Sequence, residues 1–257
     1  MFKKTCFYLM LVILFSCRET SSKQEMIYYG IDMENTIVPG EPLTIDKKGV
    51  IKQNSIIAFK LPNSDTIKLL RVIGSPGDVI EFVNGEIYIN NKLYKKVSTC
   101  LIPYVIYMKN PDNFSKITKY YYRPYLRNYW RYYITDDQYH EIVKMNIVDS
   151  IFSRWYPDDE DKRLIKVKSA KYCNKGYFGP LKVPAENSII DDDMVSVIPS
   201  YLSKNDIGKP LNNTYYFCIG DFFSDSKDSR MIGLIPKSSV IGVINNIPGV
   251  HIVSANH

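Results

Sequence analysis

The feature that most constrains the fold is a series of short strand-like runs, separated by turn signals, in the first half of the chain. These runs of apolar and β-branched residues span 56–61, 67–73, 79–83 and 86–89. Asn84 and Gly85 join the last two runs, and this dipeptide favours a tight hairpin because both turn positions must tolerate positive φ. We therefore expect antiparallel β structure in this half.

The middle of the chain departs from this pattern. Tyrosines crowd residues 120–133, and residues 136–152 have apolar spacing compatible with one amphipathic helix. Strand-like runs return from residue 183 to residue 253, punctuated by Pro and Gly. With 257 residues, 45% of them hydrophobic, the chain can fill the core of one large domain or two modest ones. We predict a mainly β fold with an inserted α/β lobe, in which the core comprises residues 28–99 and 176–253 and the lobe comprises residues 100–175.

The tyrosine cluster of the lobe allows two interpretations. Tyrosine pairs an apolar body with a polar tip, so the cluster could form a surface that contacts a peptide or a membrane interface. It could also form half-buried strands of the lobe itself. We favour the second interpretation.

The N-terminal residues have the order of an export signal. Lys3 and Lys4 precede an apolar run, residues 6–15, and the small residue Ser16 follows. The run is too short to span a bilayer, since a transmembrane helix needs about 20 apolar residues. We expect residues 1–16 to be a leader that is removed.

The end of this leader, Leu-Phe-Ser-Cys at residues 14–17, resembles a bacterial lipobox, in which cleavage precedes the cysteine and the thiol carries lipid. The alternative is an ordinary cleaved signal that happens to hold a cysteine. From this resemblance we favour lipidation of Cys17, followed by a tether over residues 17–27. Several acyl chains on Cys17 would anchor the protein far more strongly than one. The expected location is exported and membrane-anchored, as a lipoprotein on the periplasmic or extracellular side.

Composition argues against several classes of protein. The net charge of +6 is mild and scattered, which does not favour nucleic acid as a partner. No CxxC or Cys/His spacing suggests zinc, and the three histidines are far apart. Three cysteines would remain after Cys17 is lipidated and the leader is removed, so at most one disulfide could form. We expect no metal and no cofactor.

Three stretches, in order, resemble the signature boxes of the type I signal peptidase family, serine endopeptidases that remove signal peptides outside the cytoplasmic membrane. The first, DMENTIVPGE at residues 32–41, is similar to SMxPTLxxGD, with Asp32 at the serine position. The second, LLRVIGSPGD at 69–78, is similar to KRxxGxPGD, with Leu70 at the lysine position. The third, at 220–236, is similar to GDNRxNSxDSRxWGxVP. The residues that agree with these patterns are Met33, Thr36, Gly40, Arg71, Gly74, Pro76, Gly77, Asp78, Gly220, Asp221, Ser226, Asp228, Ser229, Arg230, Gly233 and Pro236.

The resemblance implies a serine–lysine dyad, and this sequence has neither member at its place. A serine hydroxyl needs a neighbouring base to become a nucleophile, and a lysine is a base only when it is neutral. Asp32 would have to form an anhydride with the peptide carbonyl, and Leu70 has no proton chemistry. We therefore predict that the catalytic site is not intact.

Two residues could rescue the site. Lys68 lies two positions before Leu70, so both side chains leave the same face of a strand, and a long lysine could lean inward. Ser226 matches the serine of the third box, which in the family helps to orient the lysine, but as a nucleophile it would need a base that the sequence does not identify.

The third box tells against simple decay. Asp228, Ser229 and Arg230 are retained, and an Arg–carboxylate pair is a rigid two-pronged contact that can hold a loop in place. The polar pair that follows Gly-Asp in the family has become Phe222 and Phe223. These two phenylalanines could face a membrane or fill space vacated by the lost dyad.

The leading functional hypothesis is a catalytically inactive, exported relative of signal peptidase. It would bind an extended peptide or preprotein segment, or modulate another envelope protein, because a peptide groove can survive loss of the dyad. The alternatives are an active serine-type endopeptidase that cleaves signal peptides with a non-standard dyad, and a structural envelope lipoprotein.

Overall fold

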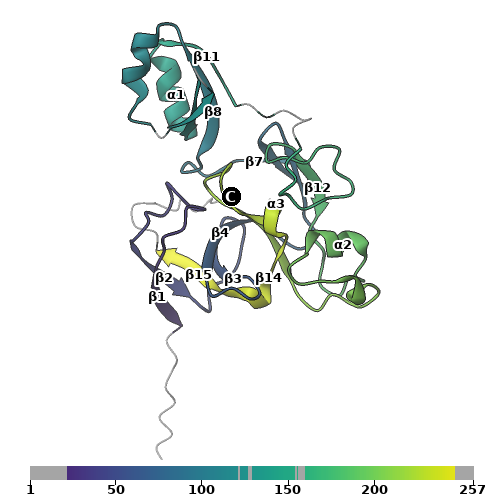
Figure 1. The fold of residues 1–257 in the computed structure, drawn as a ribbon. Coiled ribbons are helices and arrows are strands. Elements are labelled where there is room, and N and C mark those ends of the chain that lie inside the picture. The colour runs from purple at the N-terminus through teal and green to yellow at the C-terminus, as the bar shows by residue number, and fades with distance from the viewer. Residues whose placement is uncertain (1–21, 121, 127–128, 154, 156–159, 247–257) are drawn as a thin grey trace, which may run out of the picture.

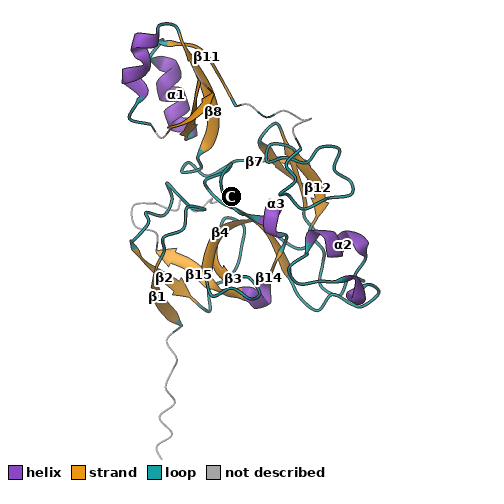
Figure 2. Cartoon of the chain, in the orientation of Figure 1, coloured by secondary structure: helices purple, strands orange, loops and turns teal. Residues whose placement is uncertain are grey.

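The computed structural model describes residues 22–120, 122–126, 129–153, 155 and 160–246. The predicted leader, Cys17 and part of the tether lie outside these residues, as do the side chains of residues 121–130. Figure 2 shows a molecule built mainly of strands and loops, with short helices among them. All pairings between the named strands are antiparallel, which confirms the predicted fold class.

A seven-stranded sheet carries the first and second boxes. Its strand order is β1-β2-β15-β3-β4-β13-β14. The strands are β1 (Lys23–Ile27), β2 (Pro42–Asp46), β15 (Val240–Asn246), β3 (Ile56–Lys60), β4 (Ile67–Gly74), β13 (Tyr215–Ile219) and β14 (Ile235–Pro236). The N-terminal strands and the C-terminal strand thus lie side by side, although they are far apart in the sequence (Figure 1).

A four-stranded sheet packs on this one through a hydrophobic cluster that is the largest among the described residues. Its order is β12-β5-β6-β7, with β12 (Phe178–Lys182), β5 (Val79–Val83), β6 (Glu86–Ile89) and β7 (Lys92–Tyr94). The predicted hairpin joins β5 and β6, and Asn84 and Gly85 both have positive φ, 51° and 79°. The four strand-like runs of the first half are therefore confirmed as β3 to β6.

The inserted lobe has a sheet and a core of its own, and it stands apart from the two other sheets in Figure 1. The sheet order is β11-β8-β10-β9, with β11 (Val148–Phe152), β8 (Ile102–Met108), β10 (Tyr129–Ile134) and β9 (Tyr122–Leu126). Tyr132 and Tyr133 are buried, so for these two tyrosines the interpretation as strands of the lobe is confirmed. The lobe also contains α1 (Asp136–Lys144) and η1 (Pro111–Ile117).

The single helix expected over residues 136–152 is wrong in its second half. Helix α1 begins at the capping box of Thr135 and Gln138 and ends at Lys144. Asn146 then adopts a positive φ of 52°, which a right-handed helix does not accommodate. The chain turns there and continues as β11, which pairs with β8.

The part of the chain outside the inserted lobe also contains short helices. They are α2 (Asp192–Val197), α3 (Ser229–Ile232), η2 (Lys204–Asp206) and η3 (Lys237–Ser239). Among the described residues, none of the helices has the length and apolar character needed to cross a membrane.

Candidate active site

The first box lies in the turn region after β1, and its apolar residues hold it against the hydrophobic core. Met33 and Ile37 are buried in the cluster that also contains Leu69 of β4. The backbone of Asp32 contacts the third box, because its carbonyl oxygen accepts a hydrogen bond from the Phe222 N–H at 3.2 Å. The first and third boxes therefore meet at Asp32.

Gly220 permits this close approach. A Cβ atom at Gly220 would lie 2.4 Å from the Asp32 carbonyl oxygen and 2.3 Å from the Cβ atom of Ser226. Both distances are far shorter than real carbon contacts, so any larger residue would push the first box away from the third. The Gly-Asp opening of the third box thus has a steric reason.

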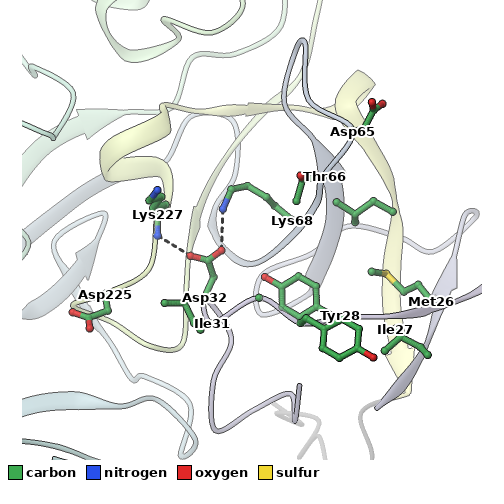
Figure 3. Close-up of a pocket in the computed structure, with 13 residues that line it drawn as sticks. Met26, Ile27, Tyr28, Ile31, Asp32, Asp65, Thr66, Lys68, Asp225 and Lys227 are labelled. Atoms are coloured by element: carbon green, nitrogen blue, oxygen red, sulfur yellow. Dashed lines mark hydrogen bonds and ion pairs between the residues drawn. The ribbon is translucent and has the colours of Figure 1, made fainter. Parts of the chain in front are cut away.

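The carboxylate of Asp32 is fully engaged (Figure 3). Its Oδ2 atom lies 2.9 Å from the Lys68 Nζ atom, and its Oδ1 atom accepts a hydrogen bond of 2.7 Å from the Lys227 backbone N–H. The side chains of Asp32 and Lys68 retain only 9% and 19% of their exposure. The position that holds a serine in the resembled family is therefore occupied by a partly buried ion pair.

Leu70, at the base position, cannot accept a proton, but the cleft does contain an amine. Leu70 is fully buried among Ile57, Phe59 and Val72. Lys68 brings its amine to the Asp32 carboxylate instead. A salt bridge between these two side chains therefore stands where the resembled family has its serine hydroxyl.

Ser226 does not supply the missing hydroxyl. It is fully buried, and its Oγ atom donates a hydrogen bond of 2.7 Å to the Asp228 Oδ2 atom. A peptide in the cleft has no access to this oxygen. Ser226 contributes to the framework of the third box.

That framework centres on a fully buried ion pair between Asp228 and Arg230. The guanidinium donates to both carboxylate oxygens, at 2.9 and 2.5 Å, and to the carbonyl oxygens of Lys175 and Phe223. Burial alone would raise the pKa of Asp228, but the Arg230 charge and hydrogen bonds hold that pKa below its ordinary value. Ser229 closes the framework, because its Oγ atom accepts a hydrogen bond from the Cys218 N–H.

A second Arg–carboxylate pair joins the second and third boxes. Arg71 donates to both oxygens of Asp221, at 2.8 and 2.6 Å, and to the Asn54 carbonyl oxygen. Thr36 of the first box also donates to the Asp221 carboxylate. Asp221 therefore ties all three boxes together.

The remaining residues of the second box shape the turn after β4. Gly74 lies against Ile80 and Phe217, where a Cβ atom would meet side-chain atoms at 2.8 to 3.1 Å. Pro76 and Gly77 follow, and Gly77 has a φ of 91°. Asp78 accepts a hydrogen bond from the Ser75 N–H, which closes the turn.

Phe222 and Phe223 are fully buried, so of the two alternatives for these rings the one in which they face a membrane is wrong. Phe222 packs against Leu101 and edge-on against Tyr133, with ring centroids 5.0 Å apart. Phe223 packs in the main core beside the Arg230 guanidinium, 4.4 Å from its ring centroid. The two rings thus dock the inserted lobe and the core onto the third box.

Sequence reasoning missed Lys175. Its side chain is buried, and its Nζ atom donates to the carbonyl oxygens of Ser224 and Ser226, at 2.5 and 2.7 Å. Burial, together with the nearby Arg230 charge, lowers the pKa of Lys175 to about 8. Lys175 supports the loop whose next N–H group, that of Lys227, binds Asp32. No local pattern marks it, because its partners lie 49 and 51 residues away.

A cleft of about 730 Å³ opens beside the ion pair. The cleft is lined by residues 26–32, by residues 65–68, and by Asp225 and Lys227. Among the described residues, no cluster of His, Cys, Asp and Glu could hold a metal ion.

Comparisons with known proteins agree with the boxes. The family described as "Signal peptidase, peptidase S26" matches residues 2–247. Signal peptidase I of Buchnera aphidicola subsp. Schizaphis graminum (strain Sg) is 28% identical to this chain over 218 residues, which cover 80% of this chain but only 57% of that protein. The crystal structure of a signal peptidase I from Enterococcus faecalis V583 is 17% identical, with a TM-score of 0.32 and coverage of 76% of this chain and 97% of that one. From the match over nearly its whole length, the chain belongs to the signal peptidase family, peptidase S26.

Proposed function

We propose that this protein is a catalytically silent member of the signal peptidase family that binds extended segments of exported polypeptides in the cleft beside Asp32. The ion pair between Asp32 and Lys68 is the observation that carries this proposal. The ion pair occupies the nucleophile position with two groups of opposite charge. The hydroxyl group of Ser226, which was the candidate to replace the missing serine, is buried and hydrogen-bonded.

The backbone of β4 supports peptide binding. Strand β13 pairs with β4 only from Arg71 onward, whereas β3 pairs with β4 from Ile67. Among the described strands, the stretch from Ile67 to Leu70 therefore has a partner on one side only. An extended peptide can add to such an edge, because backbone hydrogen bonds supply affinity without regard to sequence. The cleft also favours this function over a purely structural role.

The proposed location depends on residues outside the described part of the chain. The leader would export the protein, and lipid on Cys17 would anchor it to a membrane on the periplasmic or extracellular side. From Cys17 to the start of β1 at Lys23, an extended chain reaches at most roughly 20 Å. The cleft, which begins at the end of β1, would then lie close to the membrane from which exported polypeptides emerge.

Lipidation can be tested separately from peptide binding. The full chain expressed in a bacterium should incorporate a labelled fatty acid and remain with the membrane fraction. The Cys17→Ala variant should lose the label and be released. Equal labelling of both forms would refute the anchor and leave the peptide-binding proposal standing.

Peptide binding is tested by the fluorescence anisotropy of labelled peptides that carry the region around a signal-peptide cleavage site. The Thr66→Trp variant places a bulky ring on the cleft wall, and Thr118→Trp places the same ring on an exposed threonine of the lobe. We expect Thr66→Trp to weaken binding by at least about tenfold, and Thr118→Trp to leave it unchanged. Absence of saturable binding, or equal weakening by both variants, would overturn the proposal.

The second candidate function is an active endopeptidase with a non-standard dyad. One observation favours it, namely that the cleft holds the amine of Lys68 beside Asp32, the residue at the nucleophile position. This function predicts peptide cleavage that is lost in the Lys68→Ala variant, whereas a silent protein gives no cleavage in either form.

A further inference from the structure

A second cavity lies between the edge strand β12 and helix α2, which are next to each other in Figure 1. Its volume is about 480 Å³, and none of the residues that line it also lines the cleft beside Asp32. Sites that hold small ligands have volumes of about 300 to 1,000 Å³. This cavity is therefore large enough for a ligand of a few residues, at a place that the three boxes do not form.

The floor of the cavity is apolar. Leu181 of β12 and Val197 of α2 are buried, whereas Val167 and Met194 remain partly exposed. All four side chains belong to the main hydrophobic cluster. An apolar side chain of a ligand would remove the exposed parts of this surface from water, which favours binding.

The backbone of β12 offers hydrogen-bonding groups beside this floor. Val183 turns its N–H and C=O groups toward the β5 side, where the backbone of residues 77–78 binds each of them at 2.8 Å. Because these groups alternate in direction along an extended strand, those of Lys182 point toward the open edge. Val79 lies opposite Lys182 and agrees with this direction, since its own N–H and C=O groups bind Asn90. Among the described strands, none takes the donor and the acceptor that Lys182 presents at this edge.

Prolines limit this open edge to one residue. By the same alternation, the next outward-facing positions are Pro180 and Pro184, and neither has an N–H group to donate. The Pro180 carbonyl oxygen already accepts a hydrogen bond of 2.6 Å from the Ser169 Oγ atom. A long strand of another protein finds no continuous edge here, whereas one residue of a short extended peptide can exchange two hydrogen bonds with Lys182.

We propose that this cavity is a second peptide-binding site, which takes a short extended peptide whose central residue pairs with the backbone of Lys182. Side chains alternate between the two faces of a strand, so the two neighbours of the central residue direct their side chains to the same face as Leu181. The peptides that fit best carry apolar side chains at both of these positions. The site is independent of the cleft beside Asp32 and of the function proposed for that cleft.

The probe is the peptide Ala-Leu-Ala-Leu-Ala, acetylated at one end and joined to a fluorophore at the other. Its binding to the Thr66→Trp variant, in which the cleft beside Asp32 is narrowed, is measured by fluorescence anisotropy. We expect saturable binding. Methylation of the central backbone nitrogen removes the donor to the Lys182 carbonyl oxygen, so it should weaken binding by at least about fivefold. The peptide Ala-Ser-Ala-Ser-Ala should also bind at least about fivefold more weakly, because it has no apolar side chain for the floor.

Changes in the protein, each combined with Thr66→Trp, locate the site. Lys182→Pro removes the outward N–H group and should weaken binding by at least about fivefold. Lys182→Ala is the matched control, because it keeps the backbone groups and should leave binding unchanged. Ala185→Trp places a bulky ring on an exposed residue of the cavity lining and should weaken binding as well.

Weaker binding by Lys182→Pro and Ala185→Trp, but not by Lys182→Ala, would support the second site. If Lys182→Pro does not fold, Ala185→Trp and the methylated peptide decide. Absence of saturable binding, equal binding by all variants, or equal weakening by Lys182→Ala and Lys182→Pro would overturn the second site. Each of these results leaves the proposal for the cleft beside Asp32 standing.

Discussion

Replacing Arg230 with methionine tests whether the buried ion pair of the third box stabilises the fold. Arg230 is fully buried, and its guanidinium donates to both oxygens of Asp228 and to two backbone carbonyl oxygens. Methionine keeps much of the side-chain volume but donates no hydrogen bond. The substitution therefore removes the partners of these acceptors while leaving little new cavity.

The structure sets the size of the effect. Breaking a buried ion pair by removal of one partner costs about 3 to 5 kcal/mol, because a buried charge is left uncompensated. Each of the two carbonyl groups that lose their donor adds about 1 kcal/mol or more. We expect Arg230→Met to lower the free energy of unfolding by at least about 5 kcal/mol, a large share of the stability of an ordinary domain, which is about 5 to 15 kcal/mol.

Urea denaturation followed by fluorescence measures this difference, and the chain offers a matched control. Arg163 pairs with Asp161 at the same two-residue spacing, and the distance between the Arg163 Nη2 and Asp161 Oδ2 atoms is 2.6 Å. The Arg163 side chain is 69% exposed, however, so Arg163→Met should cost less than about 1 kcal/mol. Equal and small losses for Arg230→Met and Arg163→Met would refute the reasoning. Asp228→Asn added to Arg230→Met should recover part of the loss, because it removes the unpaired charge.

Three further predictions concern the lobe, the loop and the nucleophile position. The pKa of Lys175 is about 8 in the folded protein and about 10.5 in the unfolded chain, so the unfolded state binds more protons between these pH values. In urea titrations at successive pH, the free energy of unfolding of the wild-type protein relative to Lys175→Met should therefore rise from pH 8 to pH 10.5, and a fall would contradict the assignment. Phe222→Ala removes the contact with Tyr133, so it should cost about 3 kcal/mol and speed proteolysis between lobe and core; unchanged proteolysis would argue against docking by this ring. Asp32→Ser places a hydroxyl beside the Lys68 amine, so mass spectrometry should detect cleavage of a preprotein peptide by this variant but not by Asp32→Ser combined with Lys68→Ala. If the folded Asp32→Ser variant cleaves nothing, the arrangement of the three boxes around residue 32 is not that of an active site.

Local patterns predicted the parts of the fold that depend on neighbouring residues. The strands β3 to β6 and the Asn84-Gly85 turn follow from alternation and turn chemistry, which act over a few residues. The helix expected to continue to residue 152 failed for the same kind of reason, because the apolar spacing persists beyond Asn146 although the backbone reverses there. A periodic pattern alone does not locate such a break.

Tertiary contacts limited the prediction of the site. The spacing of Lys68 relative to Leu70 indicated that an amine could turn inward, but its pairing with Asp32 depends on how the turn after β1 meets β4. Lys175 reaches carbonyl groups about 50 residues away, and Phe222 contacts a tyrosine of the lobe, so neither role leaves a local signal. The signature boxes were informative because they record such distant contacts as residue identities.

The central claim is that the protein, with the Asp32–Lys68 ion pair at its nucleophile position, has no peptidase activity. Its direct test is the incubation of the purified wild-type protein with a preprotein that carries an alanine-type cleavage site, followed by mass spectrometry of the products. We predict that the preprotein stays intact, with no difference between the wild-type protein and the Asp32→Ala and Lys68→Ala variants. Specific cleavage by the wild-type protein that disappears in either variant would contradict the account.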